Sequence, residues 1–440
     1  MLERQCDVLV VGAGPAGLLA GGFAAKAGCS TVILESRQRP ARKLGITGKG
    51  RCNVTNARPI QEYADHVFQG FEFLQPAFSF FSNQGIVELL ARQGVPTVVE
   101  RGQRVFPTSG KARDVVDALV AWTTAQGAEL ITGAQVQRIR PMDDGTFRVR
   151  ALPSEGARLR LRAKTVVVAT GGLSYPATGS TGFGFELARL LYIDVVPPVP
   201  SLVGITLAEP IRNARNLLIK NVQLSLLDGS RQLAEAFGDL MLTDRGFDGP
   251  VALQLSRYVS TWPGPGHLTL RLDLKPALSP EKLLGRMGRE REARPYEPLL
   301  SSLRALLPNP LVAPVLLRVG VPRRAGWAAL SPAQLQQLAL TIKGMDFEVS
   351  GCEGWYRAIV TAGGIALDQL DPTTLRCHQY PHLYFCGEVL DADATTGGYN
   401  LQIAYSTGAL AGHSAAMDAK NRPALAPVGA QGAPLREECK

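Results

Sequence analysis

Cysteine is scarce in this chain and is not arranged as metal or disulfide motifs are. The seven cysteines are scattered over 440 residues, and no C-x-x-C pair occurs. This pattern argues against a disulfide framework, a zinc site and a dithiol relay, so we predict no metal site. An uncharged apolar run of about 18 residues is also missing, so we expect no membrane-spanning helix and no membrane partner. The start, M-L-E-R-Q followed by C-D-V-L-V-V, is too short and wrongly flanked for a signal peptide. We therefore expect a cytoplasmic protein.

Charged residues make up only 19% of the chain, whereas hydrophobic residues make up 45%. This composition excludes a disordered chain and provides enough apolar material for two or three domains. The net charge of +9 is compatible with nucleic acid or with an anionic cofactor. The densest basic stretch, Arg286–Arg294, interleaves Glu290 and Glu292. It is typical of a solvent-exposed helix face, with a polyanion-binding face as the alternative.

The first forty residues carry a nucleotide-binding pattern. An apolar strand, Cys6–Val11, leads into G-A-G-P-A-G-L-L-A-G, which spans Gly12 to Gly21. A second strand, Thr31–Leu34, ends at Glu35. This order is typical of a dinucleotide-binding βαβ unit, with a chance glycine turn as the alternative. The glycines permit a tight turn, close approach of a pyrophosphate and close helix packing, and Glu35 can accept hydrogen bonds from a ribose.

A second glycine-rich segment, Arg42–Asn56, reads R-K-L-G-I-T-G-K-G-R-C-N-V-T-N. It offers cations and hydrogen-bond donors close to the backbone, as an anionic cofactor requires, whereas the alternative is a flexible surface loop. We interpret Cys52 as a small packing residue, because no histidine lies near it in the sequence.

Further elements follow from apolar patterning. We predict strands at 130–132, 135–139, 146–150 and 158–161, forming a meander that interrupts a doubly wound sheet. A helix within 105–119 is expected to be capped by Thr108 or Ser109. The buried strand Thr165–Val168 is followed by A-T-G-G at its carboxyl end. Doubly wound sheets bind ligands at this end of their strands.

The chain changes character after Pro197. We predict a first part of a nucleotide-binding domain at 1–197 and an inserted domain at 198–344, β-rich over 198–276 and helical over 277–344, with helical patterns at 280–318 and 332–342. The first domain resumes at 345–420 with a strand at 383–385 and a helix that begins near Asn400. A tail at 421–440 is expected to be disordered.

Together these motifs resemble the bacterial NAD(P)/FAD-dependent oxidoreductase family of BaiN-like and aminoacetone-oxidase-like flavoproteins. The matching stretches cover nearly the whole chain: Gly12–Gly21, Lys43–Asn56, Val105–Leu119, Ala169–Gly184, Thr361–Ile365 and Tyr384–Gly408. The resemblance implies an α/β fold, a glutathione-reductase-like FAD-binding Rossmann domain with an inserted β-rich and helical domain.

The resemblance also implies the residues that hold FAD. The adenosine and pyrophosphate would bind at Gly12, Ala13, Gly14, Ala16, Gly17 and Glu35, with Val136, Ala169, Thr170 and Gly171 on the adenosine side. The flavin and phosphates would be bordered by Lys43, Gly48, Arg51, Cys52 and Asn53. The ribityl chain would lie at Gly387, Glu388 and Asp391, and the isoalloxazine at Asn400, Leu401 and Gln402.

One departure from the family pattern lies in the insert. Where the family tends to read T-H-x-G-x-S-G-P, this chain has T-D-R-G-F-D-G-P at Thr243–Pro250. The aspartates at 244 and 248 indicate a divergent subgroup, in which a substrate role for the family's histidine does not carry over.

The favoured hypothesis is an FAD-dependent enzyme that passes a hydride between flavin N5 and a small organic substrate beneath the insert. With no second nucleotide fingerprint, NAD(P)H would bind transiently or dioxygen would close the cycle. The alternatives are an RNA-associated flavoprotein and a non-catalytic flavin-binding protein. We expect no nucleic-acid partner, and the residues indicate no particular oligomeric state.

No catalytic acid or base is evident from the sequence. None of the five histidines lies in a glycine-rich motif. Tyr175 and Tyr399 lie inside cofactor-facing motifs, so either is a candidate proton donor, with packing against the flavin as the alternative.

Glu35 provides the first testable prediction. A hydrogen bond to a charged acceptor contributes about 1.5–3 kcal/mol, so Glu35→Ala should weaken FAD binding by about one to two orders of magnitude. Titration of the apoprotein with FAD measures this change. An unchanged dissociation constant would overturn the fingerprint assignment.

Overall fold

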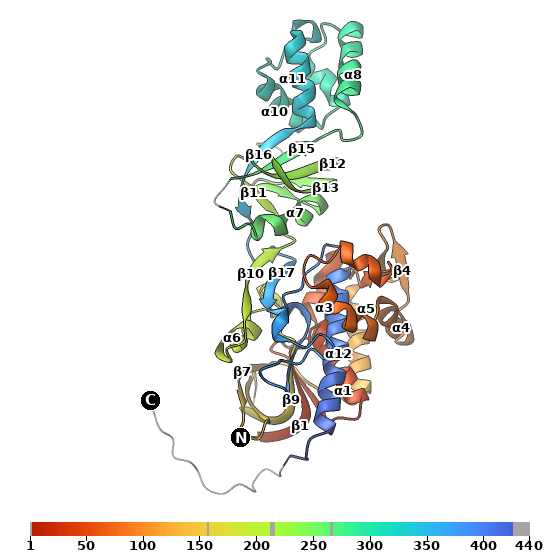
Figure 1. The fold of residues 1–440 in the computed structure, drawn as a ribbon. Helices are drawn as coiled ribbons and strands as arrows, with labels where there is room; N and C mark the ends of the chain where they lie inside the picture. The colour runs from red at the N-terminus through yellow and green to blue at the C-terminus, as the bar shows by residue number, and fades with distance from the viewer. Residues whose placement is uncertain (1, 156–157, 212–215, 265–266, 426–440) are drawn as a thin grey trace. The chain divides into compact units, whose positions relative to one another are not determined.

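The computed structural model describes residues 2–155, 158–211, 216–264 and 267–425 (Figure 1). The chain forms two compact units, unit 1 from Met1–Pro198 with Val360–Lys440, and unit 2 from Val199–Ile359. The predicted insert, 198–344, stops short of the end of unit 2, because a further strand at 345–352 closes its barrel. Most of the predicted tail, residues 426–440, lies outside the described residues.

Unit 1 is built on a seven-stranded sheet of order β6-β2-β1-β9-β8-β7, with β18 also paired to β9. Its strands are β1 (Leu2–Val11), β2 (Thr31–Leu34), β6 (Glu129–Ile131), β7 (Ala134–Pro141), β8 (Phe147–Pro153), β9 (Leu159–Val168) and β18 (Leu383–Phe385). β6, β2, β1, β9 and β18 pair in parallel, whereas β7, β8 and β9 form an antiparallel meander.

The strand β9 joins the meander to the parallel sheet. The sequence predicts two strands here, at 158–161 and 165–168, but the structure has one continuous strand. This strand pairs with β1 along its whole length. On the other side of β9, its first half pairs with β8 and its last three residues pair with β18. This arrangement places the carboxyl ends of β1, β9 and β18 at one edge, where doubly wound sheets bind ligands.

The helices of unit 1 pack on this sheet or beside it. They are α1 (Pro15–Lys26), α2 (Arg42–Ile46), α3 (Phe71–Phe80), α4 (Asn83–Arg92), α5 (Ala112–Ala125), α6 (Phe183–Leu190) and α12 (Tyr399–Lys420). Three short strands, β3 (Thr55–Asn56), β4 (Thr97–Glu100) and β5 (Arg104–Pro107), form a small sheet, and β10 (Val195–Ser201) pairs with β17 (Val360–Ile365). The predicted cap of α5 is wrong. The helix begins after Lys111 with no side-chain cap, and the Ser109 hydroxyl accepts a hydrogen bond only from the Lys111 amide.

The two faces of the sheet carry different cores. Val8 and Val10 of β1 belong to the cluster around α1, α5 and α12. Leu9 and Val11 belong to a second cluster, which includes the apolar face of the meander. This alternation is the expected consequence of the two-residue period of a strand, and it fixes which side of β1 faces the glycine-rich helix.

Helices α1 and α12 pack at backbone contact. A Cβ added at Gly408 would lie 2.2 Å from the Ala16 carbonyl oxygen, and one added at Gly412 would lie 2.0 Å from that of Ala20. Because Ala16 faces Gly408 and Ala20 faces Gly412, the helices run in the same direction. Small residues on α1 and α12 therefore allow an approach that no larger residue permits.

Unit 2 is a closed six-stranded barrel with helices inserted between its strands. The barrel order is β11-β14-β13-β12-β15-β16, with β16 paired to β11. The strands are β11 (Ile205–Leu207), β12 (Leu217–Asp228), β13 (Arg231–Leu242), β14 (Gly246–Asp248), β15 (Leu268–Asp273) and β16 (Met345–Cys352). The helices are α7 (Pro250–Ser260), α8 (Pro280–Ala293), α9 (Leu299–Ser302), α10 (Asn309–Val319) and α11 (Pro332–Lys343). The helical pattern at 280–318 is broken between α8 and α10 by Pro295, Pro298 and Pro308, each of which disfavours a continuing helix.

The contact between α1 and α12 generates a stability prediction. Gly412→Ala should destabilise the protein by about 1–3 kcal/mol, because the added methyl group has to push the two helices apart. Gly288→Ala in α8 is the matched control, since a Cβ there meets nothing within 4 Å and alanine favours the helix. Urea unfolding of both variants measures the change, and equal stability of Gly412→Ala and the wild type would contradict the close contact.

Candidate functional site

The first part of the candidate site is the turn between β1 and α1. Gly12, at φ +100°, donates its N–H to the Leu34 carbonyl at 2.8 Å. A Cβ at Gly12 would lie 2.5 Å from the Ala169 carbonyl, and one at Gly17 would lie 1.8 Å from the Gly12 carbonyl. At Gly14 an added Cβ would meet nothing within 4 Å. The turn is thus packed on its inner side by Gly12 and Gly17 and open at Gly14, as the approach of a pyrophosphate requires.

Glu35 connects this turn to the end of β2. Its Oε2 accepts the Ala13 N–H at 2.8 Å, and its Oε1 accepts the Arg37 N–H at 2.8 Å and the Ser36 hydroxyl at 3.2 Å. Only 9% of Glu35 is exposed. The carboxylate therefore orders the glycine-rich turn as well as presenting acceptors, so the Glu35→Ala variant loses both contributions.

Two helix N-termini point their free N–H groups at the same edge of the sheet. α1 begins at Pro15 after Gly14, and α12 begins at Tyr399 after Gly398, and neither helix has a side-chain cap or an acidic residue in its first turn. Gly398 lies ten residues before Gly408, whereas Gly14 lies two residues before Ala16. At 1.5 Å per residue, the start of α12 therefore extends about 12 Å beyond the start of α1. The two positive helix ends suit two separate electron-rich groups of one extended ligand.

A cluster of polar side chains joins three distant segments of unit 1. Lys43 Nζ donates to Glu388 Oε2 and to Ser174 Oγ, both at 2.5 Å. Glu388 Oε1 accepts from Ser174 Oγ at 2.6 Å and from the Thr361 N–H at 2.9 Å. The side chains of Lys43 and Glu388 are 22% and 20% exposed. Lys43 and Glu388, which the sequence assigns separately to the cofactor, are therefore brought into one charged cluster.

The segment around Gly48 forms a tight loop. Gly48, Lys49 and Cys52 all have positive φ, and the Cys52 N–H donates to the Thr47 carbonyl at 3.0 Å. The Cys52 side chain is fully buried, and burial raises the pKa of its thiol to about 12, which fits a packing role. Arg51, which the resemblance expects at the border of the flavin, makes contacts within unit 1. Its guanidinium pairs with Glu100 and lies over the Phe106 ring at 4.3 Å, with 46% of the side chain exposed.

Seven buried side-chain polar atoms in the described part of the chain have no hydrogen-bond partner, and two of them belong to expected FAD-binding residues. Among the side chains that the structure describes, Asn53 Oδ1 and Thr170 Oγ1 are buried without a hydrogen bond. Buried polar atoms are normally paired, because an unpaired one costs about 1–3 kcal/mol. The open space at Gly14 and these two unpaired atoms fit a polar ligand such as FAD.

The remaining expected residues lie on the surrounding elements. Val136 lies in β7 beside a bulge, and the Ala134 N–H donates to the Glu35 carbonyl at 2.8 Å. Ala169 donates its N–H to the Val11 carbonyl at 2.9 Å, and Gly171 follows with φ +71°. The Gly387 N–H donates to Thr407 Oγ1 of α12 at 2.9 Å. Asp391 is buried, and its N–H donates to the Ile365 carbonyl at 3.0 Å.

The polar side chains at the start of α12 form hydrogen bonds to other groups of unit 1. Asn400 bonds through its amide to the backbone of Ala394 and Thr395. Gln402 is fully buried and bonds to Thr55 Oγ1, the Phe81 carbonyl and Ser406 Oγ. Leu401 packs against the core. The side chains of Asn400 and Gln402 are thus hydrogen-bonded within unit 1, whereas the first turn of α12 has no side-chain cap.

Tyr399 packs in an aromatic cluster that the sequence did not reveal. Its ring stacks on His66 with centroids 4.4 Å apart and meets Tyr63 edge-on at 4.7 Å. Burial raises the pKa of Tyr399 to about 12, and burial together with Arg58 lowers the pKa of His66. Tyr399 is therefore protonated and His66 neutral at pH 7. The two rings are more than 300 residues apart in the chain, so no sequence pattern links them.

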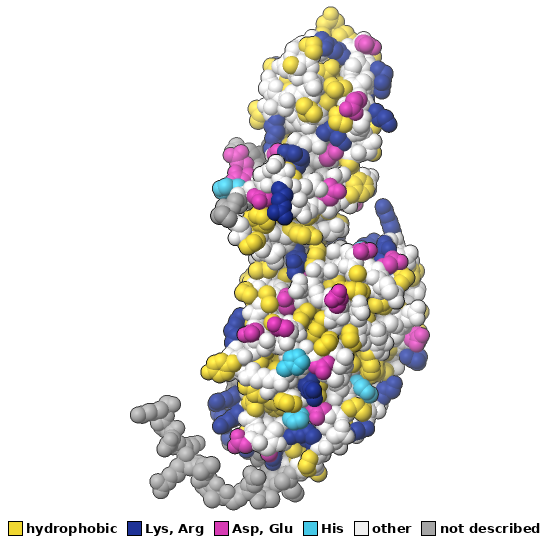
Figure 2. Space-filling view, in the orientation of Figure 1, with side chains coloured by type: hydrophobic (Ala, Val, Ile, Leu, Met, Phe, Trp, Pro, Cys, Tyr) yellow, Lys and Arg dark blue, Asp and Glu magenta, His cyan; other side chains and the backbone are white. Residues whose placement is uncertain are grey.

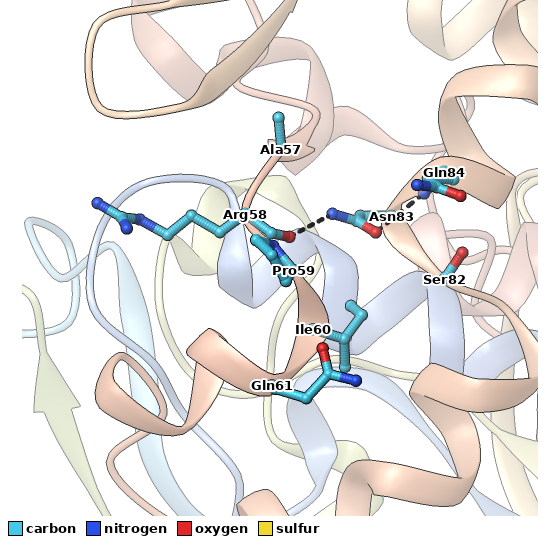
Figure 3. Close-up of a pocket in the computed structure, with 8 residues that line it drawn as sticks. All are labelled: Ala57, Arg58, Pro59, Ile60, Gln61, Ser82, Asn83 and Gln84. Carbon is cyan, nitrogen blue, oxygen red and sulfur yellow. Dashed lines mark hydrogen bonds between the residues drawn. The ribbon is translucent and has the colours of Figure 1, made fainter.

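A cleft of about 340 Å³ lies beside the loop that follows Asn56 (Figure 3). It is lined by Ala57, Arg58, Pro59, Ile60, Gln61, Ser82, Asn83 and Gln84. The Asn83 amide donates to the carbonyls of Asn56 and Arg58, which holds the two walls together. Arg58 is the only ionisable residue in this lining, so the cleft offers no acid–base pair.

The motif that departs from the family pattern, Thr243–Pro250 in unit 2, begins with a turn. Thr243 Oγ1 accepts from the N–H groups of Arg245 and Gly246, and Asp248 Oδ1 accepts the Gly249 N–H at 2.7 Å. Asp244 is exposed. Asp248 thus fixes the entry to α7 in this chain.

The described residues contain neither a metal-binding cluster nor a membrane-spanning helix. No three His, Cys, Asp or Glu side chains gather closely enough to hold a metal ion. No helix within the described ranges combines the length and apolar character that crossing a membrane requires.

Comparison with known proteins identifies the family. The family described as HI0933-like protein Rossmann domain matches residues 6–414. The ribosomal RNA dihydrouridine synthase of Haemophilus influenzae is 29% identical over 92% of this chain and 97% of its own length. The 3-dehydro-bile acid delta(4,6)-reductase of Clostridium scindens is 29% identical over 92% of this chain and 98% of its own length. The resemblance to BaiN-like flavoproteins is thereby confirmed.

The fold also resembles that of a solved structure. The 3-ketosteroid-delta4-(5alpha)-dehydrogenase from Rhodococcus jostii RHA1 superposes with a TM-score of 0.51 at 15% identity, covering 94% of this chain and 97% of the other. The fold class predicted from the sequence is confirmed.

The charged cluster provides a prediction about cofactor binding. Glu388→Gln keeps the shape of the side chain but removes the charge that holds Lys43, so FAD should bind about 10- to 100-fold more weakly. The control is Glu129→Gln, which breaks the exposed pair with Arg4 and should change FAD affinity less than twofold. Fluorescence titration with FAD measures both variants, and an equal effect of the two would contradict a role for the cluster.

Proposed function

The chain belongs to the HI0933-like Rossmann family and is a flavoprotein oxidoreductase, and we propose that it transfers a hydride between flavin N5 and a small organic substrate with a carbonyl-conjugated double bond. The observation that carries this proposal is the cradle of unit 1. It combines an open turn at Gly14, two uncapped helix ends and unpaired polar atoms on Asn53 and Thr170.

The names of the relatives support this class of substrate. A delta(4,6)-reductase of a 3-dehydro-bile acid acts on double bonds conjugated with a ketone. Dihydrouridine differs from uridine by reduction of the ring double bond next to a carbonyl. Both reactions add a hydride to one carbon of an activated double bond and a proton to the other.

In this proposal FAD supplies the hydride, and the chain supplies orientation and charge. The first-turn N–H groups of α12 stabilise negative charge that develops on a bound flavin. Lys43, oriented by Glu388 and Ser174, adds a positive charge beside the turn at Gly171. These groups are held in place before any substrate binds, so no reorganisation is needed during the reaction.

The proton donor in this proposal is Tyr175. Tyr399, the other tyrosine indicated by the sequence, is 2% exposed and stacked on His66. Tyr175 is half-buried at φ +51° and follows Ser174 of the charged cluster. A hydroxyl with access to solvent can be reprotonated after each turnover, whereas that of Tyr399 cannot be reached as readily.

A uracil base in ribosomal RNA is the second candidate substrate. Two relatives, from Haemophilus influenzae and Escherichia coli, are named ribosomal RNA dihydrouridine synthases, and this chain has a net charge of +9. The sequence-based expectation that nucleic acid is not a partner is therefore not confirmed. The hydride chemistry is the same for both candidates.

Anaerobic stopped-flow reduction tests the proposed function. We expect NADH or NADPH to reduce the flavin, and a cyclic enone to reoxidise it. Tyr175→Phe should slow reoxidation by about 100-fold or more while leaving reduction by the nucleotide unchanged. Tyr192→Phe is the control, because this residue also has positive φ but is 86% exposed. Failure of both nucleotides to reduce the flavin would exclude a reductase and favour an oxidase.

A further inference from the structure

The solvent face of the antiparallel meander in unit 1 carries six arginines, which we call the arginine grid: Arg138 and Arg140 of β7, Arg148 and Arg150 of β8, and Arg160 and Arg162 of β9. The four on β7 and β8 are exposed, and the two on β9 are half-buried. Figure 2 shows dark-blue side chains along the lower left edge of the molecule, around the position of β7 in Figure 1.

The strand register places these arginines directly opposite one another. Arg140 pairs with Arg148, which pairs with Arg162. In the neighbouring row, Arg138 pairs with Arg150, which pairs with Arg160. Like charges in directly opposed positions destabilise a sheet, so folding alone does not favour this arrangement.

Little of this charge is neutralised within unit 1. Arg162 forms an ion pair with Asp144 of the β7–β8 turn. Among the described residues, the other five arginines of the grid have no ion pair or side-chain hydrogen bond. The other basic stretch, Arg286–Arg294, differs in this respect, because Glu290 and Glu292 lie within it and Arg294 pairs with Glu297.

The opposite face of the meander is apolar and belongs to the core. It carries Val136, Ile139, Phe147, Val149, Ala151, Leu159, Leu161 and Ala163. Packing of the core therefore fixes the register of the three strands and directs the arginines to solvent. It does not require these side chains to be charged. A neutral polar residue would serve folding equally well at the five positions other than Arg162.

We propose that the arginine grid binds the sugar-phosphate backbone of RNA, an inference that rests on the second candidate function. Three strands spaced about 4.8 Å apart spread the grid over about 10 Å, with about 7 Å between its two rows. A single small anion cannot contact six guanidinium groups over this area, whereas consecutive phosphates of one strand can. Guanidinium groups on the solvent face of a sheet contact phosphates and position the RNA without reading its bases.

The test compares two quadruple variants that remove the same charge. The grid variant replaces Arg138, Arg140, Arg148 and Arg150 with Gln, and the control replaces Arg286, Arg289, Arg291 and Arg294 of α8 and its C-terminal end with Gln. Fluorescence anisotropy with a labelled single-stranded RNA of about 30 nucleotides gives the affinity at several salt concentrations. The grid variant should bind at least tenfold more weakly, and its slope of log K against log salt should fall by about 3, at about 0.7 per lost phosphate contact. The control should change affinity less than twofold.

Two further readouts keep the inference separate from the enzymatic proposal. Flavin content and reduction by NAD(P)H should be unchanged in both variants, because neither set of arginines belongs to the FAD cradle. Equal losses in the two variants would show that only net charge matters, and an unchanged grid variant would show that RNA does not bind there; either result overturns the inference. If the grid variant loses binding to vesicles that contain phosphatidylglycerol but still binds RNA, the inference is overturned in favour of a membrane surface. RNA that binds through the grid but whose uracils are not reduced contradicts the second candidate function and leaves the grid as an RNA-binding surface.

Discussion

The close contact between α1 and α12 determines the geometry of the candidate site. Glycines at 408 and 412 let the backbone of α12 meet the carbonyls of Ala16 and Ala20, and this fixes both the direction and the height of α12. The two uncapped helix ends therefore lie at one edge of the sheet and about 12 Å apart along the helix direction. A wider helix spacing would separate Gly387 from Ala16 as well, because a Cβ on Gly387 would lie 2.7 Å from the Ala16 side chain. The positions of the glycine-rich turn, the charged cluster and the uncapped start of α12 thus depend on one interface of small residues.

Strand β9 links that site to the surface of the meander. Its last residues pair with β1 and β18 and lead to Ala169 and Thr170 at the ligand edge, whereas its first residues pair with β8 and carry Arg160 and Arg162. A single rigid element therefore connects the FAD cradle with the arginine grid inside unit 1. The core face of the meander supports both, since the same buried side chains hold β8 against β9.

Local signals were predictable from the sequence, and distant pairings were not. The glycine-rich turn and the strands at 31–34 and 383–385 were predicted correctly, because turn geometry and short apolar runs leave a clear pattern. The cap of α5 was predicted wrongly, because the Ser109 hydroxyl bonds to the Lys111 amide and not to the helix. Glu100, the partner of Arg51, lies 49 positions away in the chain, and Phe81, whose carbonyl binds Gln402, lies 321 positions away. His66 and Tyr399, whose rings stack, are also distant in sequence. The arginine grid depends on strand register, which a sequence does not display.

The discontinuity of unit 1 has a consequence for how the protein is made. During synthesis β1, α1 and β2 leave the ribosome first, yet β18 and α12 follow only after the whole of unit 2. Until then the apolar side of α1 that α12 covers stays exposed, and Lys43 lacks Glu388. Unit 2, which is continuous in the chain, can complete its barrel before that moment. The part of the candidate site that α12 and Glu388 form is therefore completed only after unit 2 has been synthesised.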